Sequence, residues 1–444
     1  MKKVLIVTYY WPPAGGPSVQ RVLKFAKYLP EFGWQPIVLT VHKGEYFAID
    51  PTLNTEIQNI PTYRSFNLEP GSLYRKMTGM RPEEPIPVSI LEKPSRTFMQ
   101  KITHGIRRNL FIPDAKIGWF PFAIHKGKQV IHQEKPELIF STSPPPTVHL
   151  IAARLAHKFQ LPFVADFRDP WTAIYYYQLN PRWKCTEKMD RMLERRIMRQ
   201  AHHLTFTTRL DVEFYQARYH LGNKCTYIPN GYDEEDFQNI QIENTPEQFI
   251  IAHMGSLNYS RIPIELFQAL KTAIANQEVN PHHIRLQLIG NVDEAVKAAV
   301  DNYHLTPLVE YVGYLPHRQA LQLAARASVL LLVNFKSQVS KKIIPGKLFE
   351  YLRLRKPIFA ISPSDGEVAR ILNNIERSYV ADFDQTSPIY SGLIREYNYW
   401  QSGDFINPAI PPAVKQYDRK ILTNQLAQIF NNALTSVNKE EKQI

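Results

Sequence analysis

Short apolar runs alternate with longer amphipathic stretches along almost the whole chain, and this alternation limits the fold more than any other feature. The apolar runs have the length of strands, and the stretches between them have helical periodicity. Such alternation is typical of βαβ units, in which crossover helices join parallel strands. The sequence therefore predicts an α/β protein built on parallel sheets.

The alternation falls into two series, each with the pattern of a Rossmann-like domain. The first series predicts strands at 4–8, 36–41, 137–141, 162–166, 204–207 and 225–228. Its helices are expected at 17–30, 147–159, 186–200 and 211–219. The second series predicts strands at 249–254, 285–289, 308–312, 328–333 and 357–361. Its helices are expected at 262–276, 292–303, 317–326, 346–354 and 366–374.

A chain of 444 residues exceeds the roughly 250–300 residues at which single cores stop growing. We therefore expect two Rossmann-like domains, 1–235 and 236–410, facing one another across a cleft. The proline-rich stretch 43–135 is interpreted as an insertion of loops and helices in the first domain. A terminal helix, expected within 411–444 at about 411–435, can belong to either domain.

The net charge of +12 is unevenly distributed. Residues 1–230 carry 32 Lys and Arg against 18 Asp and Glu, whereas the rest of the chain is close to neutral. This asymmetry favours an anionic partner for the first half, which leaves nucleic acid, anionic lipid and phosphorylated substrates as candidates. At 44% hydrophobic residues, the composition excludes a mainly disordered protein.

Membrane-spanning and metal-binding signals are not found in the sequence. No apolar run approaches the ~20 residues of a spanning helix, and the apolar N-terminal run leads into WPPAGG rather than a signal-peptide cleavage site. Cys185 and Cys225 have no metal-like spacing. Asp382-Phe383-Asp384 is interpreted as a solvated loop. We expect a cytoplasmic protein that meets any membrane from its surface.

Two loops after predicted strands have the composition of phosphate-binding sites. Gly15 and Gly16 precede the helix 17–30, where backbone N–H groups and the positive end of the helix attract anions. Arg261 follows the strand-ending Gly255 and can pair with two phosphate oxygens. A plain strand-to-helix turn and an exposed surface arginine are the alternative interpretations.

A third loop lies in the segment SKKIIPGKLFEYLRLRKP (340–357). Gly346 opens a helix whose free N–H groups point at an anion, and Lys347 adds a positive charge. Glu350 lies in the first turn, from which its carboxylate can accept hydrogen bonds from both hydroxyls of a ribose. A first-turn carboxylate is also favourable helix chemistry, so a structural role is the alternative.

Further segments occur in a recognisable order: DFRDPW (166–171), YIPNGYDEEDF (227–237), GSLNYSR (255–261), LIG (288–290), VEYVGYLPH (309–317) and PGKLFEYLRLRKPI (345–358). Together with the Gly15-Gly16 loop, they resemble the retaining, nucleotide-sugar-dependent glycosyltransferases of family 4, which have the GT-B fold. The resemblance spans nearly the whole chain. It implies transfer of a sugar to a hydroxyl of a saccharide or lipid-linked acceptor, in cell-surface polysaccharide or glycolipid synthesis.

The resemblance implies a donor-binding role for nine residues. Gly16 faces the donor diphosphate, Arg261 takes the position of a phosphate-binding lysine, and Glu350 matches the second, ribose-binding Glu of an E-x7-E motif. Backbone atoms of Tyr314 and Leu315 contact the nucleobase. The other members of the set are Gly15, Ser256, Gly346 and Lys347.

The chain departs from the family pattern at two positions. Lys342 stands where the first Glu of E-x7-E is expected, and Ser256 stands where many members carry Arg. The departures concern contacts to the sugar and the phosphates. Lys341, Lys342 and Lys347 are candidates for supplying the missing positive charge.

Arg168 and Asp169 are the candidate catalytic residues on the acceptor side, because they follow the strand 162–166. A structural Asp–Arg pair that fixes the loop is the alternative. Members of the family transfer the sugar on one face, and the leaving phosphate helps to remove the acceptor proton. The resemblance therefore implies no metal and no cofactor, with the nucleotide-sugar as a substrate.

Two basic segments lie in the first half. Segment 93–116 has six Lys and Arg beside an apolar stripe, and segment 182–199 has seven beside three acids. An interfacial helix and an ordinary packed helix both fit the first segment. The second is expected to form a surface helix. We hypothesise that the first domain docks on an anionic leaflet to reach a lipid-linked acceptor.

Three other functions remain open from the sequence. A nucleotide-sugar 2-epimerase of GT-B-like fold would use the same donor half. A basic nucleic-acid-binding protein fits the charge, although no zinc, homeodomain or RNA-recognition motif is present. A non-catalytic relative fits the replacement of the first Glu by Lys342.

Overall fold

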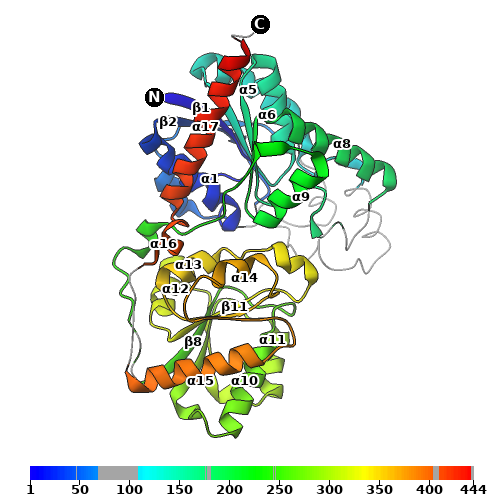
Figure 1. Ribbon diagram of the computed structural model, residues 1–444. Helices are drawn as coiled ribbons and strands as arrows, with labels where there is room; N and C mark the ends of the chain where they lie inside the picture. The colour runs from blue at the N-terminus through cyan, green and yellow to red at the C-terminus, as the bar shows by residue number, and fades with distance from the viewer. Residues whose placement is uncertain are drawn as a thin grey trace. The chain divides into compact units, whose positions relative to one another are not determined.

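The computed structural model describes residues 1–46, 48–68, 109–175, 177, 182–243, 245, 247–403 and 410–441, with side chains up to 435. The chain forms two compact units (Figure 1). The N-terminal unit comprises Met1–Pro229 and Lys420–Ile444, and the C-terminal unit comprises Asn230–Arg419. Each unit is an α/β Rossmann-like domain, which confirms the predicted fold class.

The N-terminal unit contains a parallel sheet of seven strands in the order β3-β2-β1-β4-β5-β6-β7. The strands are β1 (Lys2–Val7), β2 (Trp34–Val41), β3 (Thr62–Ser65), β4 (Leu138–Ser143), β5 (Phe163–Phe167), β6 (His203–Phe206) and β7 (Cys225–Tyr227). The helices are α1 (Pro17–Tyr28), α5 (Phe120–Glu134), α6 (Thr147–Phe159), α8 (Lys184–Gln200), α9 (Arg209–Tyr219) and α17 (Arg419–Glu441).

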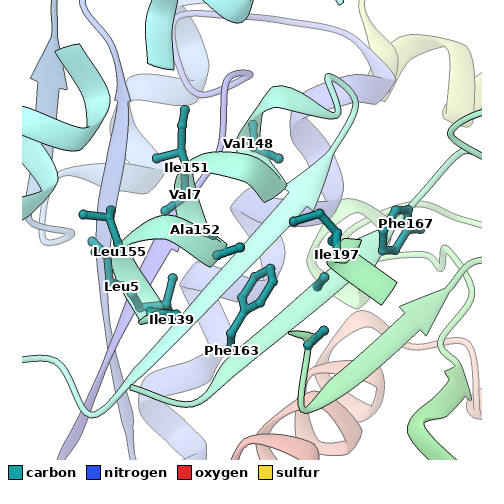
Figure 2. Close-up of a cluster of buried hydrophobic side chains, with 14 of the residues drawn as sticks. Leu5, Val7, Ile139, Val148, Ile151, Ala152, Leu155, Phe163, Phe167 and Ile197 are labelled. Atoms are coloured by element: carbon teal, nitrogen blue, oxygen red, sulfur yellow. The ribbon is translucent and has the colours of Figure 1, made fainter. Parts of the chain in front are cut away.

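Both faces of this sheet are covered by hydrophobic clusters. Successive residues of a strand point to opposite faces, so each strand contributes to both clusters. Leu5 and Val7 of β1 pack with α6 residues on one face, as Figure 2 shows. Val4 and Ile6 lie on the other face, in a cluster with residues of α1 and with Phe430 of α17. The C-terminal helix therefore completes the hydrophobic core of the N-terminal unit.

The C-terminal unit contains a parallel sheet of six strands in the order β10-β9-β8-β11-β12-β13. The strands are β8 (Phe249–Met254), β9 (Ile284–Ile289), β10 (Val309–Gly313), β11 (Val329–Val333), β12 (Ile358–Ile361) and β13 (Ser378–Ala381). The helices are α10 (Ile264–Ala275), α11 (Glu294–Asn302), α12 (His317–Ala325), α13 (Lys347–Leu354), α14 (Glu367–Leu372), α15 (Ser387–Ser402) and α16 (Pro412–Lys415). Hydrophobic clusters cover both faces of this sheet as well.

The elements missed by the sequence analysis include one edge strand of each sheet. In β3 and β13 only the last of the four residues is fully buried, so neither has the continuous apolar run of a central strand. Strand β3 and helix α5 lie in the stretch 43–135, which is therefore not simply an insertion of loops and helices. Most of the basic segment 93–116 lies outside the described residues.

Candidate functional site

Two glycines bring the loops of the C-terminal unit close together beyond β8 and β9. Gly255 has φ +101°, and a Cβ there would lie 2.9 Å from Nζ of Lys347. A Cβ on Gly290 would lie 2.7 Å from the backbone of Gly255. The first contact can be relieved by moving a flexible lysine, whereas the second involves backbone. Gly255 is therefore favoured by its positive φ, and Gly290 by its contact with backbone atoms. The close approach places Lys347 against the end of β8.

Lys347 donates a hydrogen bond to an uncharged histidine. Its Nζ lies 3.0 Å from Nε2 of His253, a fully buried residue of β8. Nδ1 of His253 lies 2.9 Å from the carbonyl of Leu331, which places the histidine proton on Nδ1. Burial, and then the charge of Lys347, lower the pKa of His253 well below its usual value. The imidazole therefore orients the ammonium group without adding charge.

The ammonium of Lys347 is destabilised in the absence of an anion. Burial first, and then the nearby charge of Arg261, lower its pKa to about 7, while Glu350 opposes the shift. Arg261, in the loop before α10, and Lys347, at the start of α13, are thus close enough to repel one another, and two such cations can together bind a phosphate group. The cluster of His253, Arg261 and Lys347 is called the cation cluster below.

Glu350, in the first turn of α13, makes a contact with the loop that follows β10. Its Oε1 lies 2.9 Å from Nε2 of His317, the first residue of α12. Tyr314 and Leu315 lie in the connection between β10 and α12, and the side chain of Tyr314 is 79% exposed. The loop that carries the exposed Tyr314 therefore lies next to the first turn of α13, which carries the Glu350 carboxylate.

The donor-side candidates of the C-terminal unit thus lie on the loop after β8, on the loop after β10 and in the first turn of α13: Ser256, Arg261, Tyr314, Leu315, Gly346, Lys347 and Glu350. The sequence analysis did not single out His253 or His317. His253 was detectable as the one imidazole in the buried strand FIIAHM. His317 ends a quoted motif, but its pairing with Glu350 depends on the fold.

Both aspartates of the D-x-D sequence, Asp382 and Asp384, interact with neighbouring side chains. Asp382 accepts hydrogen bonds from the backbone N–H and hydroxyl of Ser364, and Asp384 pairs with Lys336 at 2.6 Å. Within the described ranges, no three His, Cys, Asp or Glu side chains are grouped as metal ligands.

In the N-terminal unit, Gly15 and Gly16 form the turn that leads directly into α1. The N–H of Gly15 donates to the carbonyl of Ala48 at 2.9 Å, and a Cβ on Gly15 would lie 2.9 Å from that of Asp50. Gly16, at the start of α1, has φ +79° and open space where a Cβ would be. Conformation therefore favours glycine at 16, and packing favours it at 15.

Arg168 connects several loops at the carboxyl edge of this sheet. Its guanidinium donates to the carbonyls of Ser143 at 2.6 Å, Pro144 at 3.1 Å and Ser18. Its own carbonyl accepts a hydrogen bond from Thr207 at 2.7 Å. These contacts join the segment after β5 to the start of α1 and to the ends of β4 and β6, so they give Arg168 a positioning role.

The first carboxylate of DFRDPW is not available to a substrate. Asp166 is fully buried and receives two hydrogen bonds from Arg21, at 3.0 and 2.8 Å. Thr142 and Thr205 each donate at 2.7 Å. Burial alone would raise the pKa of Asp166, but Arg21 and these hydrogen bonds lower it overall. Arg21 rather than Arg168 is its salt-bridge partner. The side chain of Asp169 reaches the surface, but desolvation by the surrounding protein raises the pKa of its carboxyl against the opposing charge of Arg168.

The inner face of α8 holds the next part of the same segment. Asp190 accepts from the indole N–H of Trp171 at 2.8 Å and pairs with Arg182 at 2.6 Å. Glu194 accepts from the backbone N–H and hydroxyl of Thr172, at 2.9 and 2.8 Å. Burial raises the pKa of Asp190 to about 6, against the opposing charge of Arg182. Helix α8 therefore fixes the chain just beyond Asp169.

Comparison with known proteins relates the N-terminal unit to a known protein family. Residues 18–236 match the family model described as Glycosyltransferase Family 4. The N-terminal unit therefore resembles Glycosyltransferase Family 4 over nearly its whole length. No curated protein matches this sequence.

Solved structures extend the likeness of fold over both units. HepE from Anabaena, in complex with UDP, is 14% identical with a TM-score of 0.57, covering 97% of this chain and 100% of that chain. Sucrose-phosphate synthase from Thermosynechococcus elongatus is 14% identical with a TM-score of 0.57, covering 98% and 100%. A glycosyltransferase from Rickettsia africae is 13% identical with a TM-score of 0.58, covering 98% of each chain.

These likenesses show the GT-B fold, and with the match to the family model they identify the chain as a glycosyltransferase. The resemblance inferred from the sequence motifs is therefore confirmed. None of the helices within the described ranges is both long and apolar enough to cross a bilayer.

Proposed function

We propose that this protein is a retaining glycosyltransferase, similar to those of family 4, that transfers a sugar from a nucleoside diphosphate to a hydroxyl of a saccharide or lipid-linked acceptor. Its pathway would be cell-surface polysaccharide or glycolipid synthesis. The observation that carries the donor class is the cation cluster beside the N-terminus of α13. The UDP bound to HepE, which has the same fold, supports a nucleotide-sugar donor.

On the donor side, each residue has a role that follows from its chemistry. Arg261 and Lys347 bind the diphosphate oxygens and stabilise the charge that develops as the glycosidic bond breaks. The positive end of the α13 helix dipole adds to this stabilisation. Glu350 accepts hydrogen bonds from the ribose hydroxyls, and the Tyr314–Leu315 backbone contacts the nucleobase. We propose that these groups act without a metal or another cofactor.

On the acceptor side, Asp169 is proposed to orient the acceptor hydroxyl and to assist proton removal together with the leaving phosphate. Arg168, proposed from the sequence as a second catalytic residue, would act by holding this segment against three other segments of the chain. Gly15 and Gly16 would let the backbone approach the donor diphosphate. The proposed location is the cytoplasm, with peripheral attachment to the inner face of the membrane.

Purified protein incubated with a panel of nucleotide-sugars tests the function. Release of nucleoside diphosphate that depends on an added acceptor supports transfer, whereas an altered sugar nucleotide formed without acceptor would indicate a 2-epimerase. No turnover of any donor, with or without acceptor, would favour a non-catalytic relative.

Replacing either Glu350 or Arg261 by alanine is expected to lower donor turnover by about 10- to 100-fold, because each loses hydrogen bonds involving a charged group. Soluble protein yield should be unchanged. Glu294→Ala is a matched control, since Glu294 also lies in the first turn of a helix but is exposed. Wild-type turnover in the Glu350 and Arg261 variants would contradict the donor-site assignment.

Donor binding is also expected to depend on pH through Lys347. Its pKa of about 7 lies below the ordinary 10.5, so between these values the unfolded chain binds more protons and this group makes the ligand-free protein more stable as pH rises. A bound diphosphate favours the charged ammonium. Nucleoside diphosphate affinity should therefore fall from roughly pH 7 to pH 9, with proton uptake on binding.

Calorimetric titration in buffers of different ionisation enthalpy measures this proton uptake. The Lys347→Met variant should show little of it above neutral pH. Equal proton uptake by the variant and the wild type would show that another group is responsible.

A further inference from the structure

Helix α8 presents an exposed face on which positive and apolar side chains are mixed. It lies beside α6 at the surface of the N-terminal unit (Figure 1). Its exposed residues are Lys184, Cys185, Lys188, Met189, Arg191, Met192, Arg195, Arg196, Arg199 and Gln200. At about 100° per residue, they occupy about half of the helix circumference. This set is called the outer face of α8.

The outer face of α8 has six positive side chains and no acidic one. Glu187, at its margin, lies 3.2 Å from Arg191 in the one ion pair that the described residues form with the outer face. Such a charge distribution is complementary to a negatively charged surface.

Large apolar groups accompany these charges. Met189 is 55% exposed and Met192 is 62% exposed, both between arginines and lysines. Trp183, directly before the helix, is 59% exposed, and Leu110 is 65% exposed. The side chain of Asn109 accepts a hydrogen bond from the backbone N–H of Trp183 at 2.7 Å, which holds Leu110 next to the start of α8. Apolar side chains held outward in this way are unfavourable in water.

We propose that the outer face of α8 docks on an anionic lipid bilayer, with the methionines, Trp183 and Leu110 entering the headgroup region. Basic side chains mixed with exposed apolar ones favour a lipid interface, because lipid offers both phosphate charge and apolar volume. Nucleic acid would match the charge but would leave the methionines without an apolar environment.

Docking at the outer face of α8 would indicate which class of acceptor the enzyme uses. The inner side of α8 carries Asp190 and Glu194, which hold Trp171 and Thr172 just after Asp169. A bilayer bound at the outer face would thus lie one helix away from the segment proposed to orient the acceptor hydroxyl. This consequence rests on the proposed function and favours a lipid-linked acceptor, whereas the docking itself does not depend on it.

Vesicle co-sedimentation of the full chain, without any sugar donor, tests the docking. The wild type should bind vesicles of phosphatidylcholine with phosphatidylglycerol and should bind phosphatidylcholine alone weakly. In the variant Arg195→Gln/Arg196→Gln/Arg199→Gln, affinity should fall roughly 100-fold, since each cation near an anionic leaflet contributes about fivefold. Met189→Ser/Met192→Ser should also weaken binding with the charge unchanged.

A matched control removes the same charge elsewhere on the N-terminal unit. Lys128, Arg154 and Lys158 form another positive group, on α5 and α6, where the charge of Lys158 is the main cause that lowers the pKa of Lys128. Lys128→Gln/Arg154→Gln/Lys158→Gln should keep most of the vesicle binding. Equal losses in both triple variants, equal binding to neutral and anionic vesicles, or binding to oligonucleotides but not vesicles would overturn the proposal.

Nucleoside diphosphate binding, measured on the same α8 variants, separates the two proposals. Nucleotide affinity, which is assigned to the C-terminal unit, should be retained, and an unchanged unfolding transition shows that the N-terminal unit of the variants folds. A wild type that binds anionic vesicles but no nucleotide would contradict the proposed function and leave the docking surface supported.

Discussion

Replacement of Lys347 by methionine is expected to reduce glycosyl transfer by about 100- to 1,000-fold, the range for losing one preorganised charge-stabilising donor. Methionine keeps an unbranched apolar stem but removes the ammonium that Arg261 repels and His253 orients. The free energy of unfolding should fall by no more than about 1 kcal/mol, because a charge that is costly to bury is removed along with one hydrogen bond.

The rate of nucleoside diphosphate release in the presence of acceptor measures this effect. Lys336→Met is the matched control, because Lys336 belongs to the same unit but is exposed and pairs with Asp384. Activity near the wild-type level in the Lys347 variant, or an equal loss in the Lys336 variant, would mean that the cation cluster does not bind the donor.

The second large effect concerns stability. Asp166→Asn should lower the free energy of unfolding by about 3–5 kcal/mol, because it leaves the buried guanidinium of Arg21 without its counter-charge. Arg21 also donates to the carbonyls of Pro229 at 2.7 Å and Ile228 at 2.9 Å, so its position affects the end of the N-terminal unit. Chemical denaturation followed by tryptophan fluorescence measures the loss.

Asp169→Asn, three positions later, is the control for this substitution. Asp169 is exposed, so its replacement should change stability by no more than about 0.5 kcal/mol. The double variant Arg21→Met/Asp166→Leu should recover part of the stability lost by Asp166→Asn, since it leaves no unpaired buried charge. Equal stability of the Asp166→Asn variant and the wild type would contradict a structural role for the pair.

The sequence predicted the central strands well, because buried parallel strands are continuous apolar runs such as VLLLV in β11. It did not predict β3 or β13, whose residues TYRS and SYVA are mostly half-buried at the sheet edges. Helix α15 was also missed. Local patterns identify strands that are buried on both sides, and they miss edge strands, which pair with one strand only.

For the sites, the sequence indicated loops but not side-chain partners. It placed Arg261, Lys347 and Glu350 on the correct elements, since strand ends and helix starts have local signals. It did not pair His253 with Lys347, or Arg21 with Asp166, because these contacts join residues 94 and 145 positions apart. Lys341, Lys342 and Lys347 were the sequence-based candidates for the missing positive charge. The structure places Lys347 in the cation cluster.

The central claim is that the cation cluster of the C-terminal unit binds the diphosphate of a nucleotide-sugar. Calorimetric titration of wild type, Lys347→Met and Lys336→Met with a panel of nucleoside diphosphates tests this claim most directly. The wild type should bind one base preferentially, Lys336→Met should bind it equally well, and Lys347→Met should bind it at least about tenfold more weakly. Equal affinity of the Lys347→Met variant and the wild type would contradict the claim.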